Sequence, residues 1–147
     1  MINLKYMDIA LSEAKKAFDS NEVPVGCVIV KNSKILATAH NTCIQKNNST
    51  LHAEMNAIEE AITACGQKDL QDCDVYVTLE PCAMCAGALI NAKVKRVYIG
   101  AMEPKSGCFG SVTDFNQLDF NHRIETYYGI KEDECKDIIK KFFENKR

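Results

Sequence analysis

The sequence predicts one α/β domain whose helices pack on a mixed β-sheet. Two observations support this class: short apolar, β-branched segments alternate with segments of helical periodicity, and two of the strand-like segments flank a short polar turn. Strands that alternate with helices are typical of a layered α/β domain, whereas strands joined by a hairpin are antiparallel. The 147 residues and the 46% hydrophobic content fit a single domain over residues 1–147 with its own core.

The N-terminal part of the chain contains a predicted helix followed by a predicted hairpin. Apolar residues recur at steps of three and four between residues 4 and 18, which is the spacing of one helix face. This face consists of Leu4, Met7, Leu11, Ala14 and Phe18. Pro24 should end the helical segment. Residues 25–30 and 34–39 are two β-like runs, and the three residues between them suit a hairpin turn.

The middle of the chain contains a helix, a strand and a second helix. The first helix should run through Ala64, with Gly66 as its stop signal. Its apolar stripe consists of Met55, Ile58, Ile62 and Cys65. Residues 75–79 form a predicted buried strand. Pro81 should open the next helix, which runs to about Asn91, because proline is favoured in a first helical turn.

The C-terminal third completes a sheet of five strands. Residues 94–99 form the fourth predicted strand and residues 123–128 the fifth. Between them, residues 101–121 lack periodicity and are expected to be irregular. Residues 132–143 form the predicted last helix.

Composition and charge exclude several classes of protein. No run of about 18 apolar residues exists, so no membrane-spanning helix is expected. The first ten residues lack the apolar core of an export signal, so we expect a cytoplasmic protein. The net charge of −2 argues against a surface coated in positive charge, although a local patch can still bind nucleic acid.

The eight cysteines are interpreted as metal ligands and core residues, because an export signal and a loop-rich composition are both missing. Four of them are expected to pack in the core as small apolar side chains. These are Cys27, Cys65, Cys73 and Cys135.

Two short segments carry the residue types of a zinc site. They read His52-Ala53-Glu54 and Pro81-Cys82-Ala83-Met84-Cys85, and each falls at the predicted start of a helix. Cysteines three apart share one helix face, and the helix dipole at the first turn favours their thiolates. Three protein ligands plus one water are typical of catalytic zinc. We therefore predict one Zn²⁺ per subunit, held by His52, Cys82 and Cys85.

Glu54 is the predicted acid–base residue. Zn²⁺ with two thiolates and a neutral imidazole is about neutral, so a carboxylate that takes a proton from the bound water would help. Residues two apart on an ideal helix point about 200° apart. His52 and Glu54 can therefore serve one site only if His52 lies at or before the helix cap. The alternative is that Glu54 merely stabilises the helix start.

The pair H-x-E and P-C-x-x-C is the known signature of zinc-dependent nucleobase deaminases, so the match is to an established pattern. Beyond that signature, the chain resembles the bacterial tRNA-specific adenosine deaminases, which convert the wobble adenosine of an anticodon to inosine. The resemblance covers nearly the whole chain. It is carried by EVPVG at 22–26, Asn41, HAE at 52–54, VTLEPCAMCAGA at 77–88, NHR at 121–123, Phe142-Phe143 and Lys146-Arg147.

The resemblance implies a cytidine-deaminase-like three-layer α/β/α sandwich with a central mixed five-stranded sheet. It also implies a homodimer whose interface helps to build each active site, and an anticodon stem-loop of tRNA as the substrate. Glu54 would shuttle protons and Asn41 would hydrogen-bond the flipped base. The other substrate-binding residues that it implies are Val23, Pro24 and Ala53 at the base, and Lys105, Ser106 and Phe143 at the anticodon loop.

One position departs from the family, because Glu103 stands where members often carry aspartate. The side chain keeps the charge but is one methylene longer, which bears on contacts to the nucleotide backbone. At the C-terminus, we expect Phe142 to be buried and Phe143 to be exposed.

Two rival functions remain open at this point. The first is a deaminase of free guanine, cytosine or a nucleoside, which would use the same metal and carboxylate. The second is a non-catalytic RNA-binding module stabilised by a structural zinc ion, and such an ion needs a fourth protein ligand. His40, Cys108 or His122 could supply that ligand. Asn41 has a rival interpretation as well, that of a turn residue after the second strand.

Overall fold

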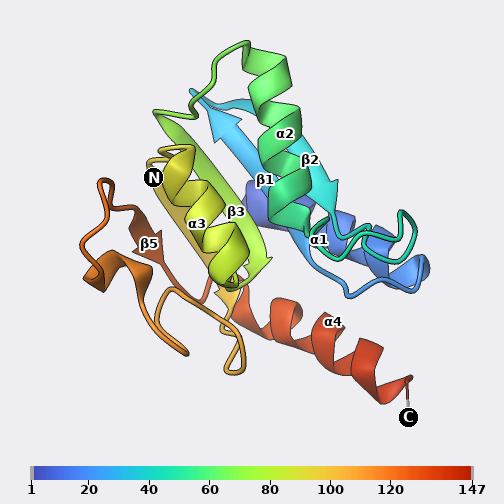
Figure 1. Cartoon of the computed structure of the whole chain (residues 1–147). Coiled ribbons are helices and arrows are strands. Elements are labelled where there is room, and N and C mark those ends of the chain that lie inside the picture. The colour runs from blue at the N-terminus through green and yellow to red at the C-terminus, as the bar shows by residue number, and fades with distance from the viewer. Residues whose placement is uncertain (1, 147) are drawn as a thin grey trace.

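The computed structural model describes residues 2–146, and Figure 1 shows how their helices and strands are arranged. In chain order the elements are α1 (Leu4–Asp19), β1 (Gly26–Lys31), β2 (Lys34–His40), α2 (Ala53–Cys65), β3 (Cys73–Leu79), α3 (Ala83–Asn91), β4 (Arg96–Ala101), a 3₁₀ turn (Phe115–Gln117), β5 (Glu125–Tyr127) and α4 (Glu132–Glu144). No helix within residues 2–146 is both long and apolar enough to cross a membrane.

The five strands form one mixed sheet, as expected, and the structure gives their order as β2-β1-β3-β4-β5. β1 is antiparallel to β2, its hairpin partner, and also to β3. β3, β4 and β5 run parallel to one another. Because the carboxyl ends of β3 and β4 meet at the same edge, the segments that follow these two strands leave the sheet side by side.

Helices cover both faces of the sheet, which confirms the predicted three-layer sandwich. α2 and α3 pack on one face, and α1 and α4 pack on the other (Figure 1). The side chains of β1 alternate between these layers: Cys27 and Ile29 join the core under α2 and α3, and Val28 and Val30 join the core under α1. Strands buried on both faces read as continuous apolar runs.

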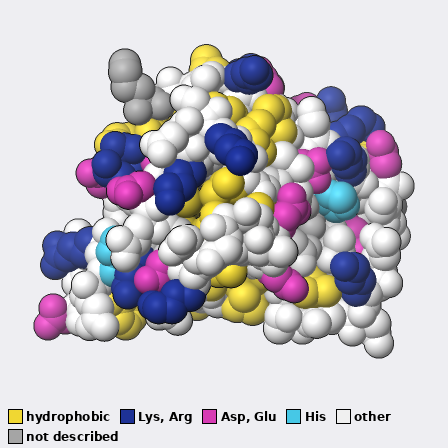
Figure 2. All heavy atoms as spheres, turned by 90° about the horizontal axis from the view of Figure 1, so that it is seen from above, with side chains coloured by type: hydrophobic (Ala, Val, Ile, Leu, Met, Phe, Trp, Pro, Cys, Tyr) yellow, Lys and Arg dark blue, Asp and Glu magenta, His cyan; other side chains and the backbone are white. Residues whose placement is uncertain are grey.

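The outside of the molecule carries both signs of charge. Figure 2 views it from above relative to Figure 1, and Lys and Arg side chains lie among Asp and Glu side chains over this face. On α4 two of the three lysines are paired within the helix, with Lys141 2.9 Å from Asp137 and Lys136 3.5 Å from Glu132. α4 therefore does not present a uniformly basic face.

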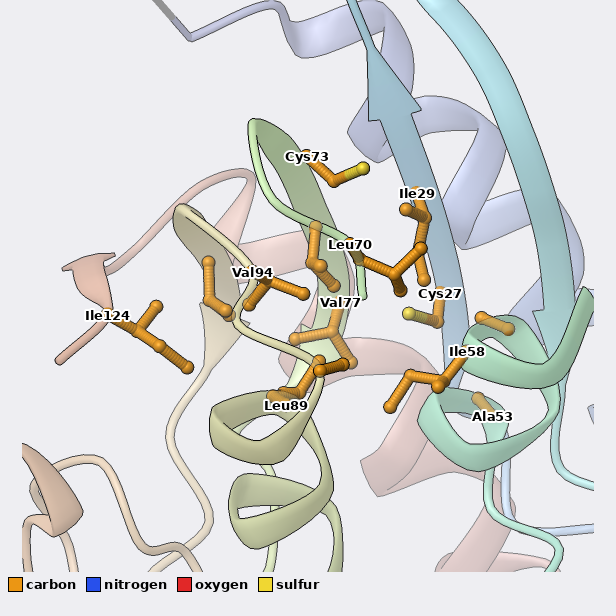
Figure 3. Packing of buried hydrophobic residues seen from close by; sticks show 14 of the residues in the cluster. Cys27, Ile29, Ala53, Ile58, Leu70, Cys73, Val77, Leu89, Val94 and Ile124 are labelled. Carbon is orange, nitrogen blue, oxygen red and sulfur yellow. The ribbon is translucent and has the colours of Figure 1, made fainter. Parts of the chain in front are cut away.

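The larger core lies between the sheet and the pair α2 and α3. Figure 3 shows Ala53 and Ile58 of α2 and Leu89 of α3 directed toward the strands, where Cys27 and Val77 lie. Cys27, Cys73 and Cys135 are buried, as expected for packing residues, whereas Cys65 is half-buried at the end of α2.

The buried faces of α1 and α2 differ from the predicted ones. The predicted α1 face included Leu4, Leu11 and Phe18, but Leu4 is 52% exposed and the other two are half-buried. Met7 and Ala14 of α1 and Ile58 of α2 are buried as predicted. The other residues of the contact are small: Ala10 and Ala17 in α1, and Ala53, Ala57 and Ala61 in α2.

Close helix–sheet packing explains this difference. A Cβ added at Gly26 of β1 would overlap the carbonyl oxygen of Ala10, so the α1 backbone lies directly against the strand. Alanine allows such an approach, whereas leucine and phenylalanine hold the backbones farther apart. The helical spacing of large apolar side chains therefore predicts a face of the helix next to the one that contacts the sheet.

Three predicted boundaries are also wrong. α3 begins at Ala83 with Cys82 as its cap, so Pro81 lies before the helix and does not open it. β4 begins at Arg96, because the Val94 amide donates to the Leu89 carbonyl of α3 and is therefore not available to the sheet. β5 spans only three residues, since its pairing with β4 is limited to Arg96–Tyr98.

Candidate active site

Two helix N-termini meet beside the carboxyl end of β3 and supply the predicted metal ligands. His52 is the N-cap of α2 and Cys82 is the N-cap of α3, and both have extended backbone conformations. Cys85 follows one turn into α3. The predicted placement of His52 at the cap is confirmed, and it explains how Glu54, two residues later, reaches the same site.

The distances between the ligand atoms fit a tetrahedral zinc ion. The Nδ1 atom of His52 lies 3.6 Å from the Cys82 sulfur and 3.5 Å from the Cys85 sulfur. Zinc with Zn–S bonds of about 2.3 Å and Zn–N bonds of about 2.05 Å holds tetrahedral sulfur and nitrogen ligands about 3.6 Å apart. The donor set of one imidazole and two thiols is also the one that zinc prefers.

No fourth side chain completes this cluster within residues 2–146. His52, Cys82 and Cys85 are the one group of potential ligands there whose donor atoms lie within 4.8 Å of one another. His40 and His122 use their rings elsewhere, with His40 2.9 Å from a Glu13 carboxylate oxygen and His122 2.7 Å from a backbone carbonyl. The Cys108 thiol likewise donates to a backbone carbonyl at 3.5 Å. This geometry matches an open, catalytic type of site.

The electrostatics of the cluster favour the ligand form of one of its three residues, Cys82. Hydrogen bonds from Cys85 and then from His52 lower the pKa of the Cys82 thiol to about 3, against the effect of burial. The adjacent Cys82 sulfur and burial raise the pKa of Cys85. The hydrogen bond to Cys82 raises the pKa of His52. A thiolate at Cys82 is the form that binds a metal ion.

Glu54 lies in the first turn of α2 and is almost fully buried, with 3% of its surface exposed. Burial raises the pKa of its carboxyl group to about 7. Its Oε1 atom is the one buried side-chain oxygen or nitrogen within residues 2–146 that lacks a hydrogen-bond partner. Buried polar atoms without partners are rare and mark functional sites, so Glu54 is held ready for a ligand or a proton.

A cavity of about 260 Å³ opens beside these residues. Its volume falls below the range of about 300–1,000 Å³ that is typical of pockets for drug-sized ligands, so it suits a ligand the size of one nucleobase. His52, Cys82 and Glu54 line it, whereas Cys85 lies outside the lining. Its lining consists of Glu22, Val23, Val25, Asn41, Cys43, Ile44, His52, Glu54, Leu79, Glu80, Cys82, Glu103 and Ser106.

The structure brings some of the implied substrate residues to this cavity and leaves others outside it. Val23, Asn41 and Ser106 line it. Pro24 is buried next to Val23 but lies outside the lining, and Ala53 is fully buried beneath it. Lys105 is exposed beside Ser106, and Phe143 is 50% exposed on α4 while Phe142 is buried, as expected.

Asn41 makes a contact that its sequence position did not suggest. Its side-chain Oδ1 accepts a hydrogen bond of 2.6 Å from the Ala53 amide, one of the free N–H groups at the start of α2. Asn41 thereby holds the helix end that carries His52 and Glu54. Its Nδ2 group takes no part in the hydrogen bonds formed among residues 2–146.

Sequence reasoning missed two buried carboxylates in the cavity wall, Glu22 and Glu80. Glu22 is 1% exposed and accepts hydrogen bonds from the amides of Ile44 and Gln45 at 3.0 and 2.7 Å. Glu80 is 2% exposed and accepts hydrogen bonds from the loop after β4. The available signal was a glutamate next to an apolar strand or turn, where a buried charge needs several partners.

This chain is similar to known proteins in family, in sequence and in structure. The model of the MafB19-like deaminase family matches residues 1–147. The tRNA-specific adenosine deaminase of Bacillus subtilis (strain 168) is 45% identical over 143 residues, which cover 97% of this chain and 89% of that protein.

Two solved structures extend the comparison. One comes from studies of A-to-I editing by tRNA:A34 deaminases at the wobble position of transfer RNA. It superposes with a TM-score of 0.90 at 39% identity, over 92% of this chain and 99% of that one. The other, a guanine deaminase from Bacillus subtilis, superposes with a TM-score of 0.65 at 28% identity, over 82% of this chain and 88% of that one.

Proposed function

Since this chain belongs to the MafB19-like deaminase family and to the tRNA-specific adenosine deaminases, we propose that it hydrolyses adenosine to inosine at the wobble position of a tRNA anticodon. The reaction consumes one water, replaces the amine on C6 of adenine by oxygen and releases ammonia. One observation carries the proposal: two members of a zinc-type ligand triad, His52 and Cys82, line the same base-sized cavity as a buried carboxylate with a free oxygen.

His52, Cys82 and Cys85 would hold one zinc ion per subunit. When bound at three protein ligands, zinc lowers the pKa of a water molecule toward neutrality and so supplies a nucleophile. Glu54 would accept a proton from the water, deliver one to the adenine ring nitrogen and later protonate the departing amine. A carboxyl pKa of about 7 suits this exchange, because both its acid and its base forms are then accessible near neutral pH.

Asn41 would bind the base while it anchors α2. Its Oδ1 is taken by the Ala53 amide, so its Nδ2 group is the part left to donate a hydrogen bond to a base in the cavity. Val23 would pack against the base from the cavity wall. Pro24 and Ala53 would support this wall from behind, since both are buried next to lining residues.

Substitution of Asn41 separates these two roles. Asn41→Asp keeps an acceptor for the Ala53 amide but removes the Nδ2 donor, whereas Asn41→Ala removes both. We expect both variants to raise KM by roughly tenfold, the usual effect of one lost hydrogen bond, and only the alanine variant to lower the melting temperature. Steady-state kinetics and thermal melting measure the two effects. An unchanged KM in both variants would remove Asn41 from base recognition.

The anticodon loop would contact the rim of the cavity. Because a stacked base cannot reach a buried site, the wobble adenosine must be splayed out of the loop. Lys105 and Ser106 stand on the rim, where a phosphate group of the loop could contact them. Lys146 hydrogen-bonds Asn21, so the end of α4 that carries Phe143 lies next to the Glu22–Val23 wall.

We place the protein in the cytoplasm with its tRNA substrate and propose that it acts as a homodimer. Exposed apolar side chains on residues 112–120, namely Val112, Leu118 and Phe120, are available for such an interface. Size-exclusion chromatography with light scattering measures the state directly, and a monomer mass at working concentration would reject the dimer.

Ammonia release from an anticodon stem-loop, compared with release from free bases and nucleosides, tests the proposed substrate. We expect turnover of the stem-loop that carries adenosine at the wobble position and sequencing that reads inosine there after treatment. A stem-loop with cytidine at that position is the matched control and should remain unchanged. Turnover of free guanine alone would instead favour the activity of the second structural relative.

A further inference from the structure

Glu80 occupies a rigid position between the sheet and the metal ligands. It follows β3 directly and precedes Pro81 and Cys82 in the chain. Its amide donates to the Ala101 carbonyl at 2.8 Å, which extends the pairing of β3 with β4 by one hydrogen bond. The side chain is 2% exposed and reaches the wall of the cavity.

The carboxylate of Glu80 binds both ends of the loop that follows β4. Oε1 accepts from the Glu103 amide at 3.0 Å and from the Ser111 hydroxyl. Oε2 accepts from the Phe109 amide at 2.9 Å and from the Ser111 amide at 3.0 Å. Between these anchors, the loop carries Lys105 and Ser106 at its exposed tip.

Two further contacts tie the same loop to the residues just before the Cys82 ligand. The Cys108 amide donates to the Pro81 carbonyl at 2.9 Å. Gly107 lies against the Glu80 carboxylate so closely that an added Cβ would overlap it. A larger residue at 107 would have to displace the Glu80 carboxylate from its hydrogen bonds, and the loop is held relative to the metal site.

Glu54 and Glu80 contrast in a way that separates their roles. Both are buried acids on the cavity, but Glu54 has an oxygen without a partner, whereas both oxygens of Glu80 are taken by N–H and O–H donors. A carboxylate that is fully hydrogen-bonded is poorly suited to exchange protons and well suited to hold backbone donors in place.

We propose that Glu80 is a positioning residue, which holds the loop of residues 103–111 over the cavity and thereby sets the affinity for the substrate. The inference rests on the proposed deaminase function. Loss of the anchor would let the loop leave its bound position, and apparent affinity falls with the fraction of molecules in the competent state. Proton transfer by Glu54 and metal binding would remain.

A graded set of variants tests the proposal. In Glu80→Gln, the amide nitrogen at the Oε1 position would face the Glu103 amide, donor against donor, while Oε2 keeps its bonds to residues 109 and 111. Glu80→Ala removes all the anchors. Ser111→Ala removes only the hydroxyl bond and tests the loop even if Glu80→Ala folds poorly.

Kinetics and hydrogen exchange give the expected pattern. For Glu80→Gln we expect KM for the stem-loop to rise by roughly tenfold, with kcat within about threefold of the parent and full zinc content. Exchange should accelerate at residues 103–111 and remain unchanged in α2. Glu59 is an exposed carboxylate on α2 outside the cavity, and Glu59→Gln is the control. It should change neither KM for the stem-loop nor the exchange rate at residues 103–111.

Two outcomes would overturn the inference: exchange that rises equally throughout the molecule, or loss of kcat with an unchanged KM. The increase in KM and in exchange rate must also be smallest for Ser111→Ala and largest for Glu80→Ala. Hydrogen exchange requires no substrate, so it tests the loop anchor even if the parent protein fails to act on the stem-loop. That failure would reject the proposed substrate, and the role of Glu80 in holding the loop would then be tested by hydrogen exchange alone.

Discussion

Glu54→Ala is expected to abolish ammonia release while the protein keeps its zinc. Removal of a general acid–base group lowers kcat by about 10²–10⁴-fold, and we expect the upper end because Glu54 would serve more than one proton transfer. Since Glu54 is outside the ligand triad, metal analysis should still find one zinc per chain. The measurement is the rate of ammonia release at saturating stem-loop, with zinc content determined on the same sample.

Stability should not fall with activity in the Glu54 variants. Burial disfavours the charged carboxylate of Glu54, as its raised pKa shows, and glutamine carries no charge, so Glu54→Gln should melt at the same temperature as the parent or higher. Glu59→Gln removes the same charge at an exposed position of the same helix and should retain full activity. Near-normal turnover by Glu54→Ala would rule out the proposed proton transfer.

Loss of a zinc ligand is expected to remove both the metal and the activity. In Cys82→Ser, the sulfur that carries the lowered pKa is replaced by a hydroxyl group, which is a much weaker ligand for zinc. Even residues that only support a ligand change metal affinity by about 10–100-fold, so we expect a loss above about 100-fold. Zinc content after dialysis against a chelator measures the change directly.

The melting temperature should fall together with the metal. Zinc that binds the folded chain stabilises it by mass action, so chelation of the parent protein should lower its melting temperature and added zinc should restore it. Cys65→Ser is the matched control, because Cys65 is a half-buried thiol of α2 outside the ligand triad. Full zinc retention by Cys82→Ser would contradict the ligand assignment.

Local patterns predicted the elements of the fold better than their contacts. The alternation of strands and helices and the short hairpin turn were enough for a mixed sheet of five strands. The buried face of α1 was not predictable in this way, because alanines that contact the sheet carry a weak apolar signal. The start of β4 depended on a hydrogen bond from Val94 back to α3, which no propensity records.

In the candidate site, too, features set by local sequence were predicted, and features set by tertiary contacts were not. Residue types and spacing predicted the cluster of candidate ligands that the structure brings together, because two cysteines one helical turn apart and a histidine with a nearby glutamate are recognisable from local sequence. Glu22 and Glu80 were missed, since their partners lie more than 20 residues farther along the chain. The irregular segment after β4 offered no periodicity from which its position could be predicted.

The amino-acid sequence alone was sufficient for the fold class and for the candidate site residues His52, Cys82, Cys85 and Glu54, because each of these predictions depends on residues that are close together or at recurring intervals. Only the tertiary structure decided which side chains surround the substrate cavity and how the loop of residues 103–111 is held there. The physical reason is that a buried carboxylate accepts hydrogen bonds from the backbone amides that folding brings next to it. Every residue except proline has such an amide, so the sequence does not identify which of them will be the partners.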